Sequence, residues 1–262
     1  MDRLKIAVAA HCFAGPLKRS LQAIAQSGAR GIQFDAQNEL KPAEFSETGR
    51  RQFLHHLDEL GLSVASLTFP TRAVLYDLEQ LEPRVAAIKG VLEFSAQLKA
   101  RVVAMRIGRI PDEPQAEEFL VLRDVLNDLC RYGNHVGATL AITPMSDSAE
   151  SLKRLFATIS SGPIGVNFDP ANCIMSGQEV GANMRALHDV LIHIQIRDAI
   201  RDLDGSGQEV PVGRGQVDWE EFLALVDEAA YHGWLTVDRT QGEDQAGDVT
   251  RAVQYLRQVA QG

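Results

Sequence analysis

Residues with chemically active side chains stand in pairs, two positions apart, where short apolar runs end. Asn167 and Asp169 close one such run, and His193 and Gln195 close another. Because side chains alternate across a strand, the two members of each pair share one face. Carboxylate, amide and imidazole groups gathered in this way can bind a polar ligand, move protons or hold a divalent ion.

Arginines also follow the apolar runs, where they could meet a ligand. They are Arg72, Arg106, Arg109, Arg197, Arg201, Arg214 and Arg239. A guanidinium group binds phosphate or carboxylate through two parallel hydrogen bonds. We therefore expect an anionic ligand, bound by Arg106, Arg197 and Arg239. The alternative is that several of the arginines pair with acidic residues of their own loops, such as Asp198 or Asp202.

The elements that must position these residues alternate along the whole chain between strand-like and helix-like segments. The expected strands cover residues 4–9, 31–34, 63–68, 101–105, 139–143, 165–169, 191–196 and 233–237. Apolar residues at helical spacing follow each strand, and one helix opens at Asp218 with an Asp-x-x-Glu221 capping box. Before that helix we expect a glycine-rich loop. Asp198, Asp202 and Asp204 in this loop are expected to be solvated and not to form a second metal site.

Eight strand–helix units of about 33 residues each are typical of a (β/α)8 barrel. An open doubly wound sheet alternates similarly, but the first strand is followed by His11 and Cys12 and not by a GxGxxG fingerprint. No linker divides the chain, so we predict an α/β fold with a single TIM barrel over residues 1–262. The candidate residues should then meet at the C-terminal mouth of the barrel. There the first strand neighbours the last, so His11 could complete a site with Asp238.

The composition narrows the classes of function. The chain has 26 Lys+Arg against 35 Asp+Glu, a formal charge of −9, which argues against nucleic-acid binding. No apolar run approaches the roughly 18 residues that cross a bilayer. Cys12, Cys130 and Cys173 are widely spaced and form no CxxC pair, which predicts neither a disulfide framework nor a thiolate zinc site. We expect a cytoplasmic protein. A nucleophilic role for Cys12 is not favoured, because no fixed base is visible beside it.

Four segments in the second half of the chain resemble one family. They are Val166-Asn-Phe-Asp169-Pro-Ala-Asn172, His193-Ile-Gln195-Ile-Arg-Asp198, Val212-Gly-Arg-Gly-Gln-Val-Asp-Trp219 and Tyr231-His-Gly-Trp-Leu-Thr-Val-Asp238. This order resembles the xylose isomerase-like TIM barrels, a superfamily of sugar and sugar-phosphate isomerases and epimerases that also includes endonuclease IV-type enzymes. The resemblance covers nearly the whole chain, and Gly213 to Asp238 is its most distinctive part.

The resemblance implies a divalent metal, Mn²⁺ or Mg²⁺, held by Glu, Asp, His and Glu at the ends of strands five to eight. In this sequence the corresponding residues are Thr143, Asp169, Gln195 and Asp238. Two carboxylates remain where the family pattern has three, and Asp238 is shorter than Glu. We therefore predict a degenerate site at Asp169, Gln195 and Asp238 in which metal binding is weak or absent.

Some of these residues also allow other interpretations. Asp147 and Glu150, just beyond Thr143, could replace the missing ligand. Asp169, before Pro170, could instead cap the following segment. His193 could be a core histidine, hydrogen-bonded inside the protein, rather than a ligand.

The resemblance implies an isomerase or epimerase that acts on a small carbohydrate, such as a sugar or sugar phosphate. Asp169, Asp238 and Thr143 are then the candidate catalytic residues. The candidate substrate-binding residues are Arg106, Arg197, Arg239, His193 and His11. The alternative is a non-catalytic sugar-binding or regulatory relative that has lost the metal-dependent chemistry. An endonuclease-like activity is disfavoured, because such relatives hold a zinc cluster with several histidines and the acidic charge opposes DNA binding. The sequence leaves the substrate and the oligomeric state open.

Overall fold

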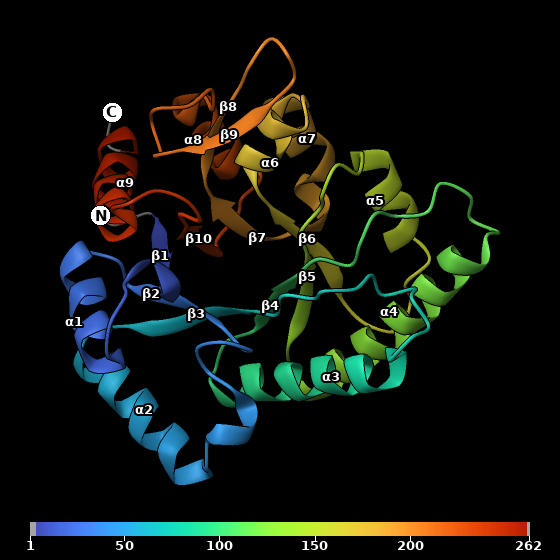
Figure 1. Cartoon of the computed structure of the whole chain (residues 1–262), viewed down its shortest axis with the longest axis horizontal. Helices are drawn as coiled ribbons and strands as arrows, with labels where there is room; N and C mark the ends of the chain where they lie inside the picture. Colours follow the sequence, from blue (N-terminus) through green and yellow to red (C-terminus); the bar gives the residue numbers. More distant parts are fainter. Residues whose placement is uncertain (1–3, 261–262) are drawn as a thin grey trace.

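The computed structural model describes residues 4–260, which form a closed barrel of parallel strands surrounded by helices (Figure 1). Around the barrel the strand order is β1-β10-β7-β6-β5-β4-β3-β2. The strands of the barrel are β1 (Lys5–Ala9), β2 (Gly31–Asp35), β3 (Ser63–Thr68), β4 (Val102–Met105), β5 (Thr139–Ile142), β6 (Ile164–Phe168), β7 (Leu191–Ile196) and β10 (Trp234–Val237). These positions confirm the predicted (β/α)8 architecture, and each predicted strand lies within about a residue or two of the observed one.

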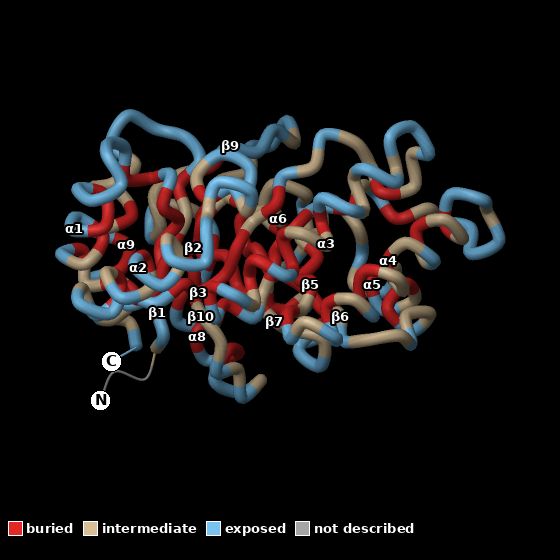
Figure 2. The backbone as a smooth tube through the Cα atoms, turned by 90° about the horizontal axis from the view of Figure 1, so that it is seen from below, coloured by how far each residue is buried: buried red, intermediate tan, exposed pale blue. Residues whose placement is uncertain are grey.

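The helices lie outside the barrel and bury one face each against it. They are α1 (Leu17–Ser27), α2 (Glu47–Glu59), α3 (Leu81–Gln97), α4 (Glu117–Val136), α5 (Ala149–Phe156), α6 (Pro170–Met175), α7 (Val180–Leu187), α8 (Trp219–Glu228) and α9 (Gln245–Val259). Short 3₁₀ turns are η1 (Ala10–Cys12), η2 (Pro42–Glu44) and η3 (His188–Val190). In α4, for example, Leu122, Leu126 and Leu129 are buried at helical spacing. Figure 2 shows the buried segments along the strands and the exposed ones in the loops.

The barrel closes between the first and last strands. Lys5 pairs with Trp234, and Val8 pairs with Val237, in a parallel register. The two strands are neighbours in Figure 1, and the segments that follow them, η1 and the loop after β10, therefore lie side by side. This closure places residues that are more than 200 positions apart in the sequence at the same point of the mouth.

Two regions differ from the sequence prediction. One helix was expected after β6, but α6 precedes α7, and Asp169 caps α6 by accepting a hydrogen bond from the Asn172 amide over 3.3 Å. The expected glycine-rich loop after β7 contains an antiparallel hairpin, β8 (Asp198–Arg201) and β9 (Gly207–Val210). Its turn includes Asp204 and Gly205, and the positive φ of Gly205 is a conformation that glycine adopts freely.

Asp198 is buried, so its prediction as a solvated residue is wrong. Its carboxylate accepts hydrogen bonds from the amides of Gly213 and Gly215, over 2.9 and 3.0 Å, and from the Trp219 indole over 3.1 Å. The Gly213-Arg-Gly215 segment thus wraps around Asp198 and fixes the start of α8. Asp202 and Asp204 are exposed, as predicted. The Asp218 side chain caps α8 through the Glu221 amide, which confirms that helix start.

None of the helices within residues 4–260 combines the length and apolarity needed to span a membrane.

Candidate active site

A cavity of about 500 Å³ opens at the mouth of the barrel, where the strands end. Its polar lining includes His11, Gln33, Glu39, Arg106, Thr143, Asn167, Gln195, Arg197, Asp238 and Thr240. Three of the four predicted metal positions, Thr143, Gln195 and Asp238, thus face one space. The fourth, Asp169, is buried and contacts the cavity residue Arg197. The structure therefore gathers these candidates at one mouth.

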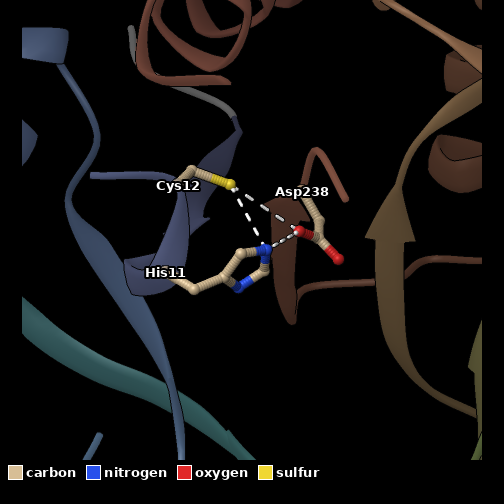
Figure 3. Close-up of side chains that lie close together, drawn as sticks. All are labelled: His11, Cys12 and Asp238. Carbon is tan, nitrogen blue, oxygen red and sulfur yellow. Dashed lines mark hydrogen bonds and ion pairs between the residues drawn. The ribbon is translucent and has the colours of Figure 1, made fainter. Parts of the chain in front are cut away.

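His11 and Asp238 form an ion pair at the edge of the cavity. His11 Nε2 lies 3.0 Å from Asp238 Oδ1, and the Cys12 thiol lies beside both (Figure 3). Hydrogen bonds with Asp238 and Cys12 raise the pKa of His11 to about 11, although burial opposes the shift. Burial raises the pKa of Asp238, but the hydrogen bond and charge of His11 outweigh it and hold this pKa below its usual range. At neutral pH the pair is an imidazolium and a carboxylate.

A polar network runs from the lining of the cavity into the barrel interior. Gln195 Nε2 donates to Asp238 Oδ2 and to Gln33 Oε1, both over 3.0 Å. Gln33 Nε2 donates to Ser66 Oγ over 2.9 Å. Each buried amide therefore has partners, which fixes its orientation, since a buried polar group without a partner is costly. Gln195 holds the Asp238 carboxylate in place from the side opposite His11.

His193 lies in this network and not on the cavity wall. Its Nδ1 donates to Asn167 Oδ1 over 2.8 Å, because the Asn167 amide nitrogen is itself donating to Thr143 Oγ1. The hydroxyls of Ser66 and Thr236 lie 3.1 and 3.0 Å from Nε2, which is the accepting nitrogen of the ring. Burial lowers the pKa of His193 to about 3, so the ring is neutral. His193 is thus a core histidine, which the sequence analysis gave as the alternative to a ligand, and both its ring nitrogens have hydrogen-bond partners.

Arg197 is a buried cation that faces the cavity. Its Nη1 donates to Asp169 Oδ2 over 2.8 Å, and its Nε donates to Glu209 Oε2 over 3.1 Å. Arg239 Nη1 donates to the other Glu209 oxygen over 3.0 Å. Burial lowers the pKa of Arg197, but the charges of Asp169 and Glu209 outweigh burial and raise this pKa above its usual range. Arg197 is therefore a permanent positive charge at the cavity.

The family profile described as "Xylose isomerase-like TIM barrel" matches residues 21–259. The chain belongs to the xylose isomerase-like TIM barrel family. A search of curated protein sequences finds no match.

Several solved structures share the whole fold. A xylose isomerase domain protein from Planctomyces limnophilus is 22% identical, with a TM-score of 0.86 over 99% of this chain and 98% of that one. An L-ribulose 3-epimerase is 14% identical, with a TM-score of 0.80 over 98% and 95%. A xylose isomerase-like barrel protein from Mycobacterium smegmatis, solved in complex with magnesium, is 16% identical, with a TM-score of 0.78 over 98% and 96%. At these identities the likeness shows the fold alone.

The four positions at which the sequence resemblance implies metal ligands do not fit a divalent ion. Asp169 already binds the Arg197 guanidinium, and Asp238 is bound by an imidazolium and by Gln195. Gln195 directs its amide nitrogen at the carboxylate, and Thr143 Oγ1 accepts a hydrogen bond from a neighbouring asparagine. A divalent ion needs negative oxygen ligands, but here a fixed cation takes up one carboxylate of the set. The potential metal ligands at these positions are therefore already bound to other side chains of the protein.

The candidate anion-binding arginines have different surroundings. Arg197 is ion-paired across elements, with Asp169 from the end of β6 and Glu209 from β9, rather than within its own loop. Arg239 is buried between Glu209 and Asp248 and does not line the cavity. Arg106 is exposed, lines the cavity, and forms no ion pair with the described part of the chain. Arg106 is thus the arginine best placed for an anionic ligand.

Two site residues were missed in the sequence. Glu209 is 2% exposed and binds Arg197, Arg239 and the Thr240 amide. Glu39 lines the cavity and accepts from the Asp35 amide over 2.7 Å, and burial raises its pKa. The Asp204-Gly205 pair indicates a turn, but it does not mark the short strands on either side, so it does not place Glu209 in a strand. No pattern marks Glu39, which stands in the loop after β2.

Neither proposed substitute ligand reaches the cavity wall. Asp147 accepts hydrogen bonds from the amides of Ile110 and Met145, over 2.8 and 3.3 Å, and so ties two loops together. Glu150 is exposed in the first turn of α5. Both carboxylates serve local structure and do not restore the ligand missing at Thr143.

Proposed function

We propose that the chain isomerises or epimerises a small carbohydrate in the barrel-mouth cavity without a divalent ion at the four family positions. The observation that carries this proposal is the juxtaposition of one carboxylate, Asp238, with two cations, His11 and Arg197, along the same cavity. Enolisation next to a carbonyl requires a base for the carbon-bound proton and positive groups for the oxygen that gains charge.

In this proposal Asp238 accepts the proton, and His11 and Arg197 stabilise the enolate oxygen. Arg197 directs its Nη1, Nε and Nη2 at neighbouring groups, and the guanidinium carries five N–H donors, so Nη1 keeps one donor for a ligand. The pKa of Asp238 lies below its usual range, which makes it a weak base. Turnover should therefore be slow.

The substrate we propose carries a carboxylate or phosphate group in addition to its sugar hydroxyls. Arg106 supplies the exposed positive charge at the cavity, and the amides and hydroxyls of Gln33, Asn167 and Thr143 supply neutral hydrogen bonds. The L-ribulose 3-epimerase that shares this fold acts on a neutral ketose by its name, which makes ketoses the reference compounds. The cytoplasmic location remains a prediction from the sequence.

Hydrogen exchange at carbon tests the proposal. Chelator-treated protein is incubated in D₂O with ketoses, sugar phosphates and sugar acids, and deuterium at the carbon beside the carbonyl is followed by NMR. We expect incorporation with an anionic sugar, loss of incorporation in Asp238→Asn, and no change in Asp204→Asn, an exposed control. Incorporation that persists in Asp238→Asn contradicts the assigned base.

A non-catalytic carbohydrate-binding protein is the second candidate. It is favoured by the ion pairs of Asp169 and Asp238, which leave neither carboxylate free to act as a strong base. Binding of a sugar, measured by calorimetry, without any deuterium incorporation would select this candidate over the first.

A further inference from the structure

His11, Cys12 and Asp238 bring three different potential ligand atoms close to one another. His11 and Cys12 are consecutive in η1, and consecutive side chains usually point apart, yet both turn toward Asp238 (Figure 3). His11 Nε2 lies 3.0 Å from Asp238 Oδ1 and 3.6 Å from Cys12 Sγ, and Cys12 Sγ lies 3.7 Å from the same Asp238 oxygen.

This triangle has the dimensions of one face of a tetrahedral zinc site. Zinc lies about 2.0–2.3 Å from nitrogen, oxygen and sulfur ligands, which puts tetrahedral ligand atoms about 3.3–3.6 Å apart. The separations set the shortest distance from an equidistant point to the three atoms at about 2.0 Å, in their plane, so an ion slightly outside that plane lies within the range of about 2.0–2.3 Å from each. An ion therefore fits with only small shifts of the side chains.

We propose that His11, Cys12 and Asp238 bind a thiophilic divalent ion, of which Zn²⁺ is the type, at a site that shares only Asp238 with the four family positions. Thiolate and imidazole ligands favour zinc over magnesium and manganese, which prefer oxygen. The absence of a CxxC pair does not bear on this set, because it uses a single thiolate. Of the family positions, the new site uses Asp238 alone.

The surroundings complete the site. His11 and Asp238 line the cavity, so a fourth coordination position opens toward it, as in catalytic zinc sites. Gln195 donates to the other oxygen of Asp238 and fixes the carboxylate from behind. Such partners of metal ligands orient them and tune the affinity.

The cations beside Asp169 and Asp238 differ in whether a metal can replace their protons. Imidazole and thiolate bind a metal in their deprotonated forms, so a proton on His11 Nε2 and the proton of the Cys12 thiol leave for solvent as the ion enters. At Asp169 the competing cation is Arg197, which cannot lose its proton.

The ion and the proton-transfer pair exclude each other. The ion occupies His11 Nε2 and Asp238 Oδ1, the two atoms that form the ion pair. Any carbon–hydrogen exchange that depends on this pair should stop when the site is loaded. The metal site itself does not depend on the proposed carbohydrate reaction.

Cobalt titration of the full chain, with no carbohydrate present, tests the site. We expect one equivalent of Co²⁺ to produce near-ultraviolet thiolate-to-cobalt absorption and intense tetrahedral visible bands, both displaced by one equivalent of Zn²⁺. Cys12→Ser should abolish the near-ultraviolet absorption, and His11→Gln should weaken Co²⁺ affinity at least about tenfold. Cys130→Ser, a matched change at a buried cysteine of α4, should leave both unchanged.

Other outcomes overturn the site. Thiolate absorption that persists in Cys12→Ser, or disappears in Cys130→Ser, assigns the ion elsewhere. Co²⁺ spectra without thiolate absorption in the unsubstituted protein also refute it. The His11 side chain is 44% exposed, so His11→Gln should keep the fold and isolate the loss of a ligand. Because the titration contains no sugar, the site can fail while deuterium exchange succeeds, and the reverse.

Discussion

Glu209 should be a main stabilising residue of the mouth of the barrel. It stands on β9 with its carboxylate buried between two arginines, and it also accepts from the Thr240 amide over 2.8 Å. Glu209→Gln keeps the shape of the side chain and removes its charge. The change leaves Arg197 and Arg239 buried with one carboxylate each, Asp169 and Asp248.

The expected loss follows from the burial of these charges. Removing one partner of a buried ion pair costs about 3–5 kcal/mol, because it leaves an uncompensated charge. Each arginine keeps one carboxylate, so we expect the lower end, about 3 kcal/mol of unfolding free energy. In a chain of this size that lowers Tm by roughly 6–12 °C.

Urea unfolding measures this loss against a matched control. Glu221→Gln makes the same change in an ion pair with Arg185 that is about half exposed, and should cost no more than about 1 kcal/mol. Equal losses in Glu209→Gln and Glu221→Gln would refute the reasoning, since burial would then make no difference.

The loss in Glu209→Gln should also depend on pH. Burial raises the pKa of Glu209, but Arg197 and the hydrogen bonds with Thr240 and Arg197 outweigh it and hold this pKa below 4.5. A carboxylate with a lowered pKa stabilises the folded state above its unfolded pKa and loses this effect as the pH falls through the folded pKa. The difference between Glu209→Gln and the unsubstituted protein should therefore be complete at neutral pH and shrink below about pH 4.5.

Two further predictions concern the cavity. In Asp238→Asn the pKa of His11 should fall from about 11 toward 6.5. The ion pair stabilises the folded state fully below pH 6.5 and loses this effect as the pH rises through the folded pKa of His11, so the substitution should remove most of that stabilisation. NMR titration of the His11 ring measures the shift, and an unchanged pKa contradicts the assigned partner. The protein as purified should carry little Mn²⁺ or Mg²⁺, and the triple variant Thr143→Glu, Gln195→His and Asp238→Glu should bind Mn²⁺ more tightly. Adding Arg197→Met to this variant should raise the Mn²⁺ affinity at least about tenfold more, because it removes a fixed positive charge. Calorimetry that shows no further gain would mean that Arg197 does not prevent metal binding.

The barrel could be predicted because its signals are local and repeated. Each strand is a short apolar run, and each helix has its own apolar stripe. The eight strand–helix units can therefore be recognised from local sequence patterns, without knowledge of any long-range contact. The meeting of His11 with Asp238 follows from one global fact, that the first strand of a closed barrel pairs with the last. The predicted fold and the closure of the barrel together therefore indicate which residues meet at the mouth.

The charge partners at the mouth could not be predicted, because they depend on elements with weak signals. The hairpin strands have four residues each and mix polar with apolar side chains, so alternation does not mark them. Without the hairpin, Glu209 looks like a solvated residue, and the ion pairs of Arg197 cannot be foreseen. Asp198 was misplaced for a related reason: its partners are mainly backbone amides, whose positions the sequence does not show.

The cations at the mouth decide what else the site can accept. Arg197 is held by Asp169 and Glu209 and keeps its proton at any accessible pH, so a divalent ion at Asp169 would add its full charge beside a fixed one. His11 is also a cation beside Asp238, but it releases its proton when a metal competes for the ring nitrogen. Of the cations that contact Asp169 and Asp238, Arg197 is therefore permanent and His11 is exchangeable. The exchangeable one makes two states possible, a protonated pair suited to acid–base chemistry and a metal-loaded state in which that chemistry is blocked.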